Sequence, residues 1–437
     1  MQMKKRVLKD TQDPRICVIG AGPSGLAAAK NLKEHGLTNI QVFEKNNQVG
    51  GNWVYDEHNN HSSVYETTHI ISSKRWSEFE DFPMPSAYSD YPSHAQLLHY
   101  FKSYAQHFEL NQYISFKTTV LNVKPLDTGQ WRVLSEDEQG VHETMFDFLL
   151  VANGHHWDPV VPTYPGYFSG ELLHSHQYKN SKAFRDKRVL VVGGGNSACD
   201  VAVETSRVAA KVQISMRRGY HIFPKFIFGK PTDVAMTKIH WLPSWFRQKL
   251  ISLVIRGLQG RYAKYQLMKP DSGPLETHPT INSELLYFIR HGKVKPRPGI
   301  LRFEGPKVHF VDGSQEDFDT IIFATGYQIS FPFFDKSIID FTNTTKIPLY
   351  RKMMHPDFDN LYFIGLCQPQ GCIWPLADYQ SKIAARIIAG AMARPGQLHQ
   401  KIAEEIKSPH YSFNSNVRHA LEVDFHLFRR ELLEMLT

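Results

Sequence analysis

Two glycine-rich segments carry the clearest chemistry in this sequence. The first, Gly20-x-Gly22-x-x-Gly25, directly follows a β-rich run and opens a helical pattern. In such a turn the first glycine allows a tight bend, the second lets the backbone approach a pyrophosphate, and the third lets the helix lie close to the strand. The N–H groups at the start of the helix would face the phosphates. Glu44 stands 19 residues after Gly25, where a carboxylate accepts hydrogen bonds from an unphosphorylated ribose.

The second segment, Gly193-x-Gly195-x-x-Ala198, repeats this pattern with the alanine that the third position also allows. Arg217 stands 19 residues after Ala198 and Arg218 follows it, where the first unit has an acid. Guanidinium groups at this place suit a ribose 2′-phosphate, although they could also be ordinary solvated charges. The second unit therefore predicts a site for NADPH rather than NADH.

The elements that must position these turns are two β-α-β units, at residues 15–44 and 188–216. Because the same β-α-β unit with a glycine turn occurs twice, we expect an α/β fold with two Rossmann-like dinucleotide-binding domains. Residues 223–295 are aromatic-rich and mostly helical in pattern, which predicts an insertion or lid. Close behind Glu44, small residues at 49–51 would let a loop pass near a flavin, against which Trp53 could pack.

The composition narrows the class of protein further. A formal charge of +7 can indicate nucleic acid or an anionic membrane surface, but the Lys and Arg residues are scattered, which favours anionic cofactors and no nucleic acid. Four cysteines among 437 residues do not suggest a secreted disulfide scaffold. The N-terminus has no apolar signal region and no stretch is long enough to span a bilayer, so we expect a soluble, cytoplasmic protein.

Three other patterns admit competing interpretations. Cys367-x-x-x-x-Cys372 has the spacing of a redox disulfide, but in disulfide reductases that pair follows the first glycine motif. His155-His156 and His174-x-His176 have no Cys or carboxylate at complementary spacing, so we expect no metal. The amphipathic segment 417–436 is expected to pack on the body of the protein, the alternatives being a partner or a membrane.

Between the two glycine motifs, Phe168-x-Gly170-x-x-x-His174-x-x-x-Tyr178 resembles the fingerprint F-x-G-x-x-x-H-x-x-x-Y/F of the flavin-containing monooxygenases, which are class B flavoprotein monooxygenases. The resemblance covers about residues 14–390. Further segments that look like this family are Ser62–Tyr65, Asp81–Pro83, Ser215–Gly219 and Gly365–Pro369.

The resemblance implies that NADPH reduces FAD and that the reduced flavin reacts with O₂ to give a C4a-hydroperoxide. This species passes one oxygen atom to a soft nucleophile, an amine nitrogen or a thioether sulfur. A Baeyer–Villiger oxygenase or an N-hydroxylase could share the scaffold, but the Baeyer–Villiger fingerprint typically ends in Trp-Pro, where this chain has Tyr178-Lys179. An NADPH oxidase that releases H₂O₂ is the other enzyme alternative, and a redox-sensing binding module is the non-enzyme one.

One departure from the family bears on the chemistry. The family often has Thr-Asn three residues before a Lys, and this chain has Ile70-Ile71 there, before Lys74. The family asparagine is thought to hydrogen-bond near the flavin, which isoleucine cannot do. Either a neighbour replaces it or more peroxide leaks. We assign no catalytic residue, and the candidates for the replacement are His69, Ser72 and Ser73.

The resemblance also implies domain limits and cofactor contacts. The NADPH domain, residues 166–328 with the insertion at about 223–295, interrupts an FAD domain formed by residues 1–165 and 329–437, and a homodimer is possible. The FAD contacts expected are Gly20, Gly22, Pro23, Ser24, Gly25, Glu44, Lys45, Gly51, Asn52, Trp53, Thr325, Gly326 and Gln380. The NADPH contacts expected are Gly193, Gly195, Asn196, Ser197, Ala198, Arg217 and Arg218.

Overall fold

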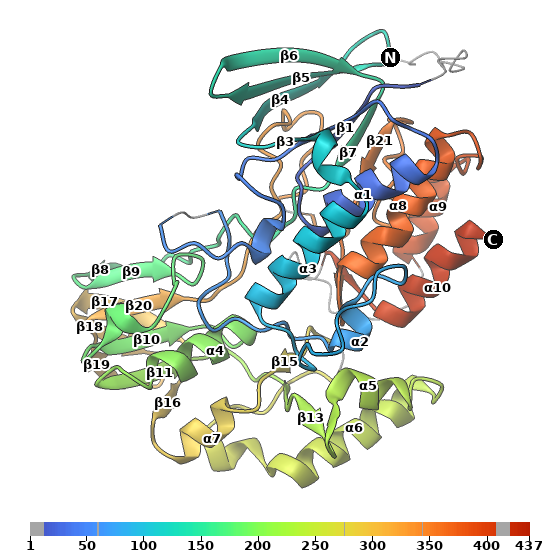
Figure 1. Ribbon diagram of the computed structural model, residues 1–437. Helices are drawn as coiled ribbons and strands as arrows, with labels where there is room; N and C mark the ends of the chain where they lie inside the picture. Colours follow the sequence, from blue (N-terminus) through green and yellow to red (C-terminus); the bar gives the residue numbers. More distant parts are fainter. Residues whose placement is uncertain (1–12, 59–60, 275, 343, 408–419) are drawn as a thin grey trace.

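The computed structural model describes residues 13–58, 61–274, 276–342, 344–407 and 420–437 (Figure 1). One five-stranded sheet has the order β21-β7-β1-β2-β3, and every neighbouring pair in it is parallel. Its strands are β1 (Ile16–Ile19), β2 (Ile40–Phe43), β3 (Ile114–Ser115), β7 (Phe148–Val151) and β21 (Leu361–Phe363).

Helices cover this sheet because its strands are apolar on both faces, as parallel strands must be. Helix α1 (Pro23–Glu34) begins with a proline at its first turn and packs along α8 (Trp374–Ile388). Helix α3 (His94–His107) begins at a capping box between Ser93 and Gln96. Helix α10 (Phe425–Leu436) packs on α8, so the described part of the C-terminal segment lies against the body, as expected (Figure 1). Residues 417–419 of that predicted segment lie outside the described residues.

A second five-stranded parallel sheet has the order β16-β11-β10-β20-β9. It consists of β9 (Glu171–His174), β10 (Arg188–Val192), β11 (Lys211–Ser215), β16 (Val294–Arg297) and β20 (Thr320–Phe323), with α4 (Asn196–Thr205) and α7 (Leu285–Arg290) packed on it. The first sheet takes strands from both sides of this segment. The prediction of two Rossmann-like domains, one inserted in the other, is therefore confirmed, while the exact domain limits remain a prediction.

Smaller elements complete the two domains. An antiparallel meander, β4 (Thr119–Pro125), β5 (Trp131–Asp137) and β6 (Gly140–Phe146), lies beside the first sheet. Beside the second sheet, β8 (Gly166–Phe168), β17 (Ile300–Gly305), β18 (Lys307–Phe310) and β19 (Gln315–Asp317) form a four-stranded sheet. Short elements include η1 (Gly51–Trp53), α2 (Lys74–Ser77), η2 (Leu110–Tyr113), η3 (Lys182–Phe184), β22 (Gln368–Pro369), α9 (Leu398–Lys407) and β23 (Glu422–Val423).

The predicted insertion forms one end of the molecule, at the bottom of Figure 1. Besides α5 (Thr232–Thr237), α6 (Ser244–Gln259) and η4 (Tyr262–Tyr265), it contains the short strands β12 (Ile222–Phe223), β13 (Phe226–Ile227), β14 (Lys230–Pro231) and β15 (Thr280–Ile281). Among the residues that the structure describes, no helix has both the length and the apolar character to cross a bilayer.

Candidate functional site

The first glycine turn joins β1 to α1 and is shaped as its motif requires. A Cβ added at Gly25 would lie 1.8 Å from the Gly20 carbonyl oxygen, because the helix packs directly on the strand end. A Cβ at Gly22 would meet only Gly51, whose Cα would be 3.5 Å away. Gly22 is the N-cap of α1, and no side chain caps that helix. The turn therefore leaves a cradle of free N–H groups that fits a pyrophosphate.

Glu44 follows β2 and is buried beside this turn. Its Oε2 accepts a hydrogen bond from the Ala21 N–H at 2.7 Å, and its Oε1 accepts one from the Asn46 N–H at 2.8 Å. Burial raises the pKa of Glu44, and the two N–H groups oppose that effect. Since a carboxylate can accept about four hydrogen bonds, Glu44 keeps the capacity to bind ribose hydroxyls. Burial also lowers the pKa of the adjacent Lys45.

The loop after Glu44 returns over the turn. The Gly50 N–H donates to the Ala21 carbonyl at 3.1 Å, which brings Gly51 against Gly22. The Asn52 Oδ1 accepts hydrogen bonds from the N–H and the hydroxyl of Ser63, both at 2.8 Å. The Trp53 ring meets Trp374 edge-on, with 5.7 Å between centroids. Asn52 and Trp53 thus lie near the predicted flavin site, and their side chains also hold neighbouring segments.

The second glycine turn joins β10 to α4 in the same way. Gly195 is the N-cap of α4, again without a side-chain cap. The Asn196 Oδ1 accepts a hydrogen bond from the Ile281 N–H at 2.6 Å, so this side chain binds the insertion. Ser197 is exposed and Ala198 is buried on the first turn of α4. The turn offers the same N–H cradle for a second pyrophosphate.

Arg217 and Arg218 are the second and third residues past the end of β11, whereas Glu44 directly follows the last residue of β2. The Arg217 side chain is exposed, and the Arg218 guanidinium lies 5.4 Å from the centroid of the Tyr220 ring. Within the described residues neither arginine forms an ion pair. Two guanidiniums are therefore available to a 2′-phosphate at the second turn.

Thr325 and Gly326 follow strand β20, where the chain leaves the second domain, and Gln380 lies on α8. The Thr325 hydroxyl donates to the Val160 carbonyl, and the Gly326 carbonyl accepts from the Val160 N–H at 2.9 Å, so both belong to the paired linkers between the domains. The Gln380 Oε1 accepts from the Gly365 N–H at 2.9 Å inside the protein. Their assignment to FAD remains a prediction.

Sequence reasoning missed one segment beside the first turn. The Ala152 carbonyl covers Gly20, just as the Ala324 carbonyl covers Gly193, with 2.7 Å and 2.4 Å to an added Cβ. The segments that follow, Ala152-Asn153-Gly154 and Ala324-Thr325-Gly326, share the pattern Ala-x-Gly after a buried strand. This repeated pattern is the signal that could have identified Asn153 and Gly154.

The segment with Ile71 holds the three candidates to replace the family amide. His69 Nδ1 hydrogen-bonds to the Thr67 carbonyl at 2.9 Å, and the Ser72 hydroxyl bonds to the Ser77 hydroxyl at 2.9 Å. The Ser73 N–H donates to Asp233 of α5 at 2.6 Å, but its buried hydroxyl has no hydrogen-bond partner among the described residues. The side chains of His69 and Ser72 therefore have structural partners, and Ser73 stays a candidate.

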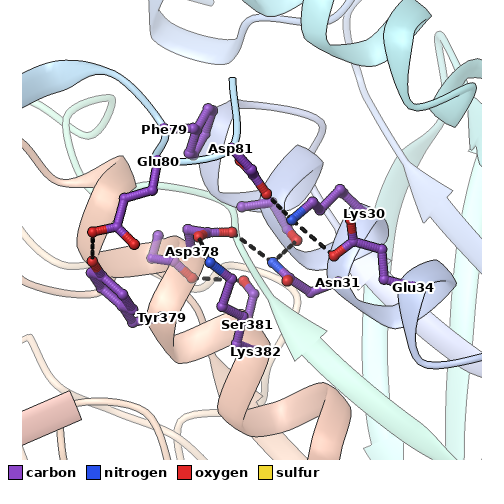
Figure 2. Close-up of polar contacts among 12 residues, drawn as sticks. Lys30, Asn31, Glu34, Phe79, Glu80, Asp81, Asp378, Tyr379, Ser381 and Lys382 are labelled. Carbon is purple, nitrogen blue, oxygen red and sulfur yellow. Dashed lines mark hydrogen bonds and ion pairs between the residues drawn. The ribbon is translucent and has the colours of Figure 1, made fainter. Parts of the chain in front are cut away.

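A network of charged side chains ties the Asp81-Phe82-Pro83 motif to the helices that carry the site (Figure 2). Lys30 on α1 is only 1% exposed, and its ammonium contacts Asp81 and also Glu34, the latter at 2.9 Å. The neighbouring Asn31 donates to Asp378 of α8 at 2.7 Å. Because α1 begins at the first glycine turn, this network fixes the helix whose N-terminus forms the cradle.

The cysteine and histidine patterns do not form rival sites. Cys367 and Cys372 are buried free thiols, and burial raises the pKa of Cys367 to about 12 and that of Cys372 well above its usual value, which is the opposite of a reactive thiolate. Burial lowers the pKa of His174 to about 4, with a smaller effect from His176. Over the described part of the chain, no group of three or more potential ligands could hold a metal ion.

Comparisons with known proteins agree with this architecture. The family model described as flavin-binding monooxygenase-like matches residues 13–436. Flavin-containing monooxygenase 5 of Rattus norvegicus is 38% identical over 407 residues, which are 88% of this chain and 75% of the relative. "Dimethylaniline monooxygenase [N-oxide-forming] 2" of Oryctolagus cuniculus is 33% identical over 404 residues, 88% of this chain and 75% of the relative.

A solved structure shows the same fold at lower sequence identity. The S-allyl-L-cysteine S-oxygenase of Allium sativum is 21% identical, with a TM-score of 0.72 over 97% of this chain and 88% of its own. The predicted family, fold class and oxidoreductase class are confirmed. The chain, with its two Rossmann-type domains and paired glycine turns, belongs to the flavin-binding monooxygenase-like family.

Proposed function

We propose that this protein uses NADPH and O₂ to insert one oxygen atom into a soft nucleophile, an amine nitrogen or a thioether sulfur, with FAD at the first glycine turn and NADPH at the second. The observation that supports the assignment of the two nucleotides is the change of charge just past the corresponding strands, where the buried Glu44 bonds to Ala21 of the first turn and the exposed Arg217 follows β11. An acid there disfavours a 2′-phosphate and a guanidinium favours it.

The residues of the chain bind and orient the cofactors. When bound, FAD supplies hydride acceptance and oxygen activation, which no protein side chain provides. The free N–H groups after Gly22 and Gly195 bind the two pyrophosphates, Glu44 binds the ribose of FAD, and Arg217 binds the 2′-phosphate of NADPH. The linker pair that includes Val160 and Thr325 holds the two domains in register.

Sequence features favour N- or S-oxygenation over a Baeyer–Villiger reaction. The chain is 38% identical to a flavin-containing monooxygenase, and its fingerprint ends in Tyr178-Lys179 rather than Trp-Pro. The test is product analysis with a thioether, a tertiary amine and a cyclic ketone at equal concentrations. Sulfoxide and N-oxide as the main products support the proposal, and a lactone as the main product contradicts it.

Ile71 supports a second candidate function, an NADPH oxidase that releases peroxide. This side chain cannot donate a hydrogen bond, and the Ser72 hydroxyl already bonds to Ser77. Peroxide equal to NADPH consumed, with every nucleophile tested, would favour the oxidase. In that case Ile71→Asn should lower the ratio of peroxide to NADPH, whereas Ile70→Asn, one residue away, should not.

We further propose a cytoplasmic location and a homodimer. Cell fractionation tests the first, and size-exclusion chromatography with light scattering tests the second.

A further inference from the structure

A short segment of the insertion crosses the second glycine turn. This segment, Pro279–Asn282, contains β15, and we call it the strap. The Thr280 hydroxyl donates to the Gly194 carbonyl at 2.9 Å, and the Ile281 N–H donates to Asn196 Oδ1 at 2.6 Å. The strap is therefore hydrogen-bonded to the turn that would hold the second pyrophosphate.

The strap ends at Asn282, whose buried side-chain amide forms hydrogen bonds through both its oxygen and its nitrogen. Its Oδ1 accepts hydrogen bonds from the N–H groups of Glu284 and Leu285, at 2.9 Å and 2.6 Å, and so caps helix α7. Its Nδ2 donates to Asp200 Oδ1 at 2.7 Å. Because α7 is fixed on the second sheet, Asp200 and α7 together fix the end of the strap.

Asp200 lies one turn into α4, the helix that begins at the second glycine turn. Its other oxygen, Oδ2, accepts a hydrogen bond from the Tyr65 hydroxyl at 3.0 Å. Tyr65 comes from the first domain and packs edge-on against Tyr178, the last residue of the fingerprint, with 5.5 Å between ring centroids. One carboxylate thus joins the first domain, the insertion and the helix of the second turn.

The two neighbours of Asp200 suit a carboxylate. The Tyr65 hydroxyl and the Asn282 amide both donate to Asp200, one to each of its oxygens. An asparagine could still accept from Asn282 and donate to the Tyr65 oxygen, which can also accept, so only a side chain without polar atoms removes both bonds. Within the described residues Asp200 forms no ion pair, although the charge of Lys225 opposes the rise in the Asp200 pKa that burial causes.

We propose that Asp200 is a positioning residue for NADPH, because it holds the strap closed over the second glycine turn and so slows the departure of the oxidised nucleotide. This inference rests on the proposed function. Asp200 itself needs no contact with the nucleotide. The negative charge of Asp200 would weaken the binding of an anion nearby, so any favourable effect on affinity must come from position.

The test is the affinity of the FAD-loaded, oxidised enzyme for NADP⁺ in Asp200→Ala, which removes both hydrogen bonds, measured by isothermal titration calorimetry. We expect the dissociation constant to rise roughly tenfold, as for one lost hydrogen bond to a charged group. Loss of a negative charge alone would instead lower the constant. Hydrogen–deuterium exchange should be faster in the strap and unchanged in the first glycine turn, with the FAD content of the wild type.

Three further variants separate the possible causes. Asp312→Ala makes the same chemical change at an exposed turn of the same domain and should leave NADP⁺ binding unchanged. Thr280→Val removes the bond from the strap to the turn and should weaken NADP⁺ binding without altering Asp200. Tyr65→Phe keeps the Asn282 bond, so exchange in the strap should stay at the wild-type rate while exchange around Tyr65 rises.

Two failures can be told apart. If wild-type protein with full FAD does not bind NADP⁺, the proposed function fails. If the wild type binds NADP⁺ and Asp200→Ala matches it in affinity and strap exchange, the positioning role of Asp200 is overturned.

Discussion

Two alanine substitutions in the first glycine turn, three residues apart, should both abolish FAD binding but should differ in their effect on the free energy of unfolding. At Gly22 the backbone is extended, with φ −71° and ψ −179°, and the added Cβ would meet Gly51 at 3.5 Å, an ordinary contact distance. The fold can therefore accept Gly22→Ala, and we expect a change in unfolding free energy of no more than about 1 kcal/mol. The methyl group would instead occupy the cradle proposed for the pyrophosphate.

The loss of FAD affinity follows from the hydrogen bonds that this methyl group blocks. If it prevents two N–H groups from reaching the phosphates, at about 1.5 kcal/mol each, FAD binding weakens by at least about 100-fold. Gly25→Ala differs because its Cβ would lie 1.8 Å from the Gly20 carbonyl oxygen, and helix α1 would have to move off the strand. We expect that change to destabilise even the flavin-free protein by about 3 kcal/mol or more.

The assay compares flavin absorbance per protein after purification with urea unfolding of the flavin-free variants. Gly22→Ala should be colourless with a wild-type unfolding midpoint, and Gly25→Ala should be colourless with a lowered midpoint. A Gly22→Ala protein that retains FAD at wild-type affinity would refute the placement of the pyrophosphate. So would a Gly22→Ala protein that loses FAD only because it unfolds.

Three further predictions follow from other parts of the structure. Arg217→Ala should raise the dissociation constant for NADP⁺ roughly tenfold or more and leave that for NAD⁺ unchanged in calorimetry, because one guanidinium–phosphate contact is lost. Asp81→Asn should cost about 1–2 kcal/mol in urea unfolding, because the Lys30 ammonium, which is 1% exposed, loses Asp81 but keeps Glu34 as a counter-charge. His174 takes up a proton below pH 6.5 when the chain is unfolded, but only near pH 4 when it is folded. The free energy of unfolding should therefore fall by up to about 3 kcal/mol as the pH is lowered from 6.5 to 4. In His174→Gln this pH dependence should be weaker.

Local patterns were sufficient to predict the two nucleotide units. β1 and β10 are apolar runs that end at glycine turns, and the similar length of the two β-α-β units places Glu44 one residue past β2 and Arg217 two residues past β11. Helix α8 begins at Trp374 with Pro375 in its first turn, where a proline fits a helix. Strand β9 was missed because it lies within the fingerprint segment.

Contacts between distant residues could not be predicted in this way. Tyr65 and Asp200 are 135 residues apart and Thr280 and Gly194 are 86 apart, and neither pair has a local signal in the sequence. The same holds for Gln380, whose side-chain oxygen accepts a hydrogen bond from the Gly365 N–H. A residue of the right type near a motif therefore predicts the region of the fold in which its side chain lies, but not the hydrogen-bond partners of that side chain.

The most direct test of the central proposal is a single reaction under ¹⁸O₂ with NADPH and a small thioether, in which NADPH consumed, sulfoxide formed and peroxide released are measured together. We predict sulfoxide that carries one ¹⁸O atom, in an amount close to the NADPH consumed. Peroxide equal to the NADPH, with no labelled sulfoxide, would contradict the account and make the protein an NADPH oxidase.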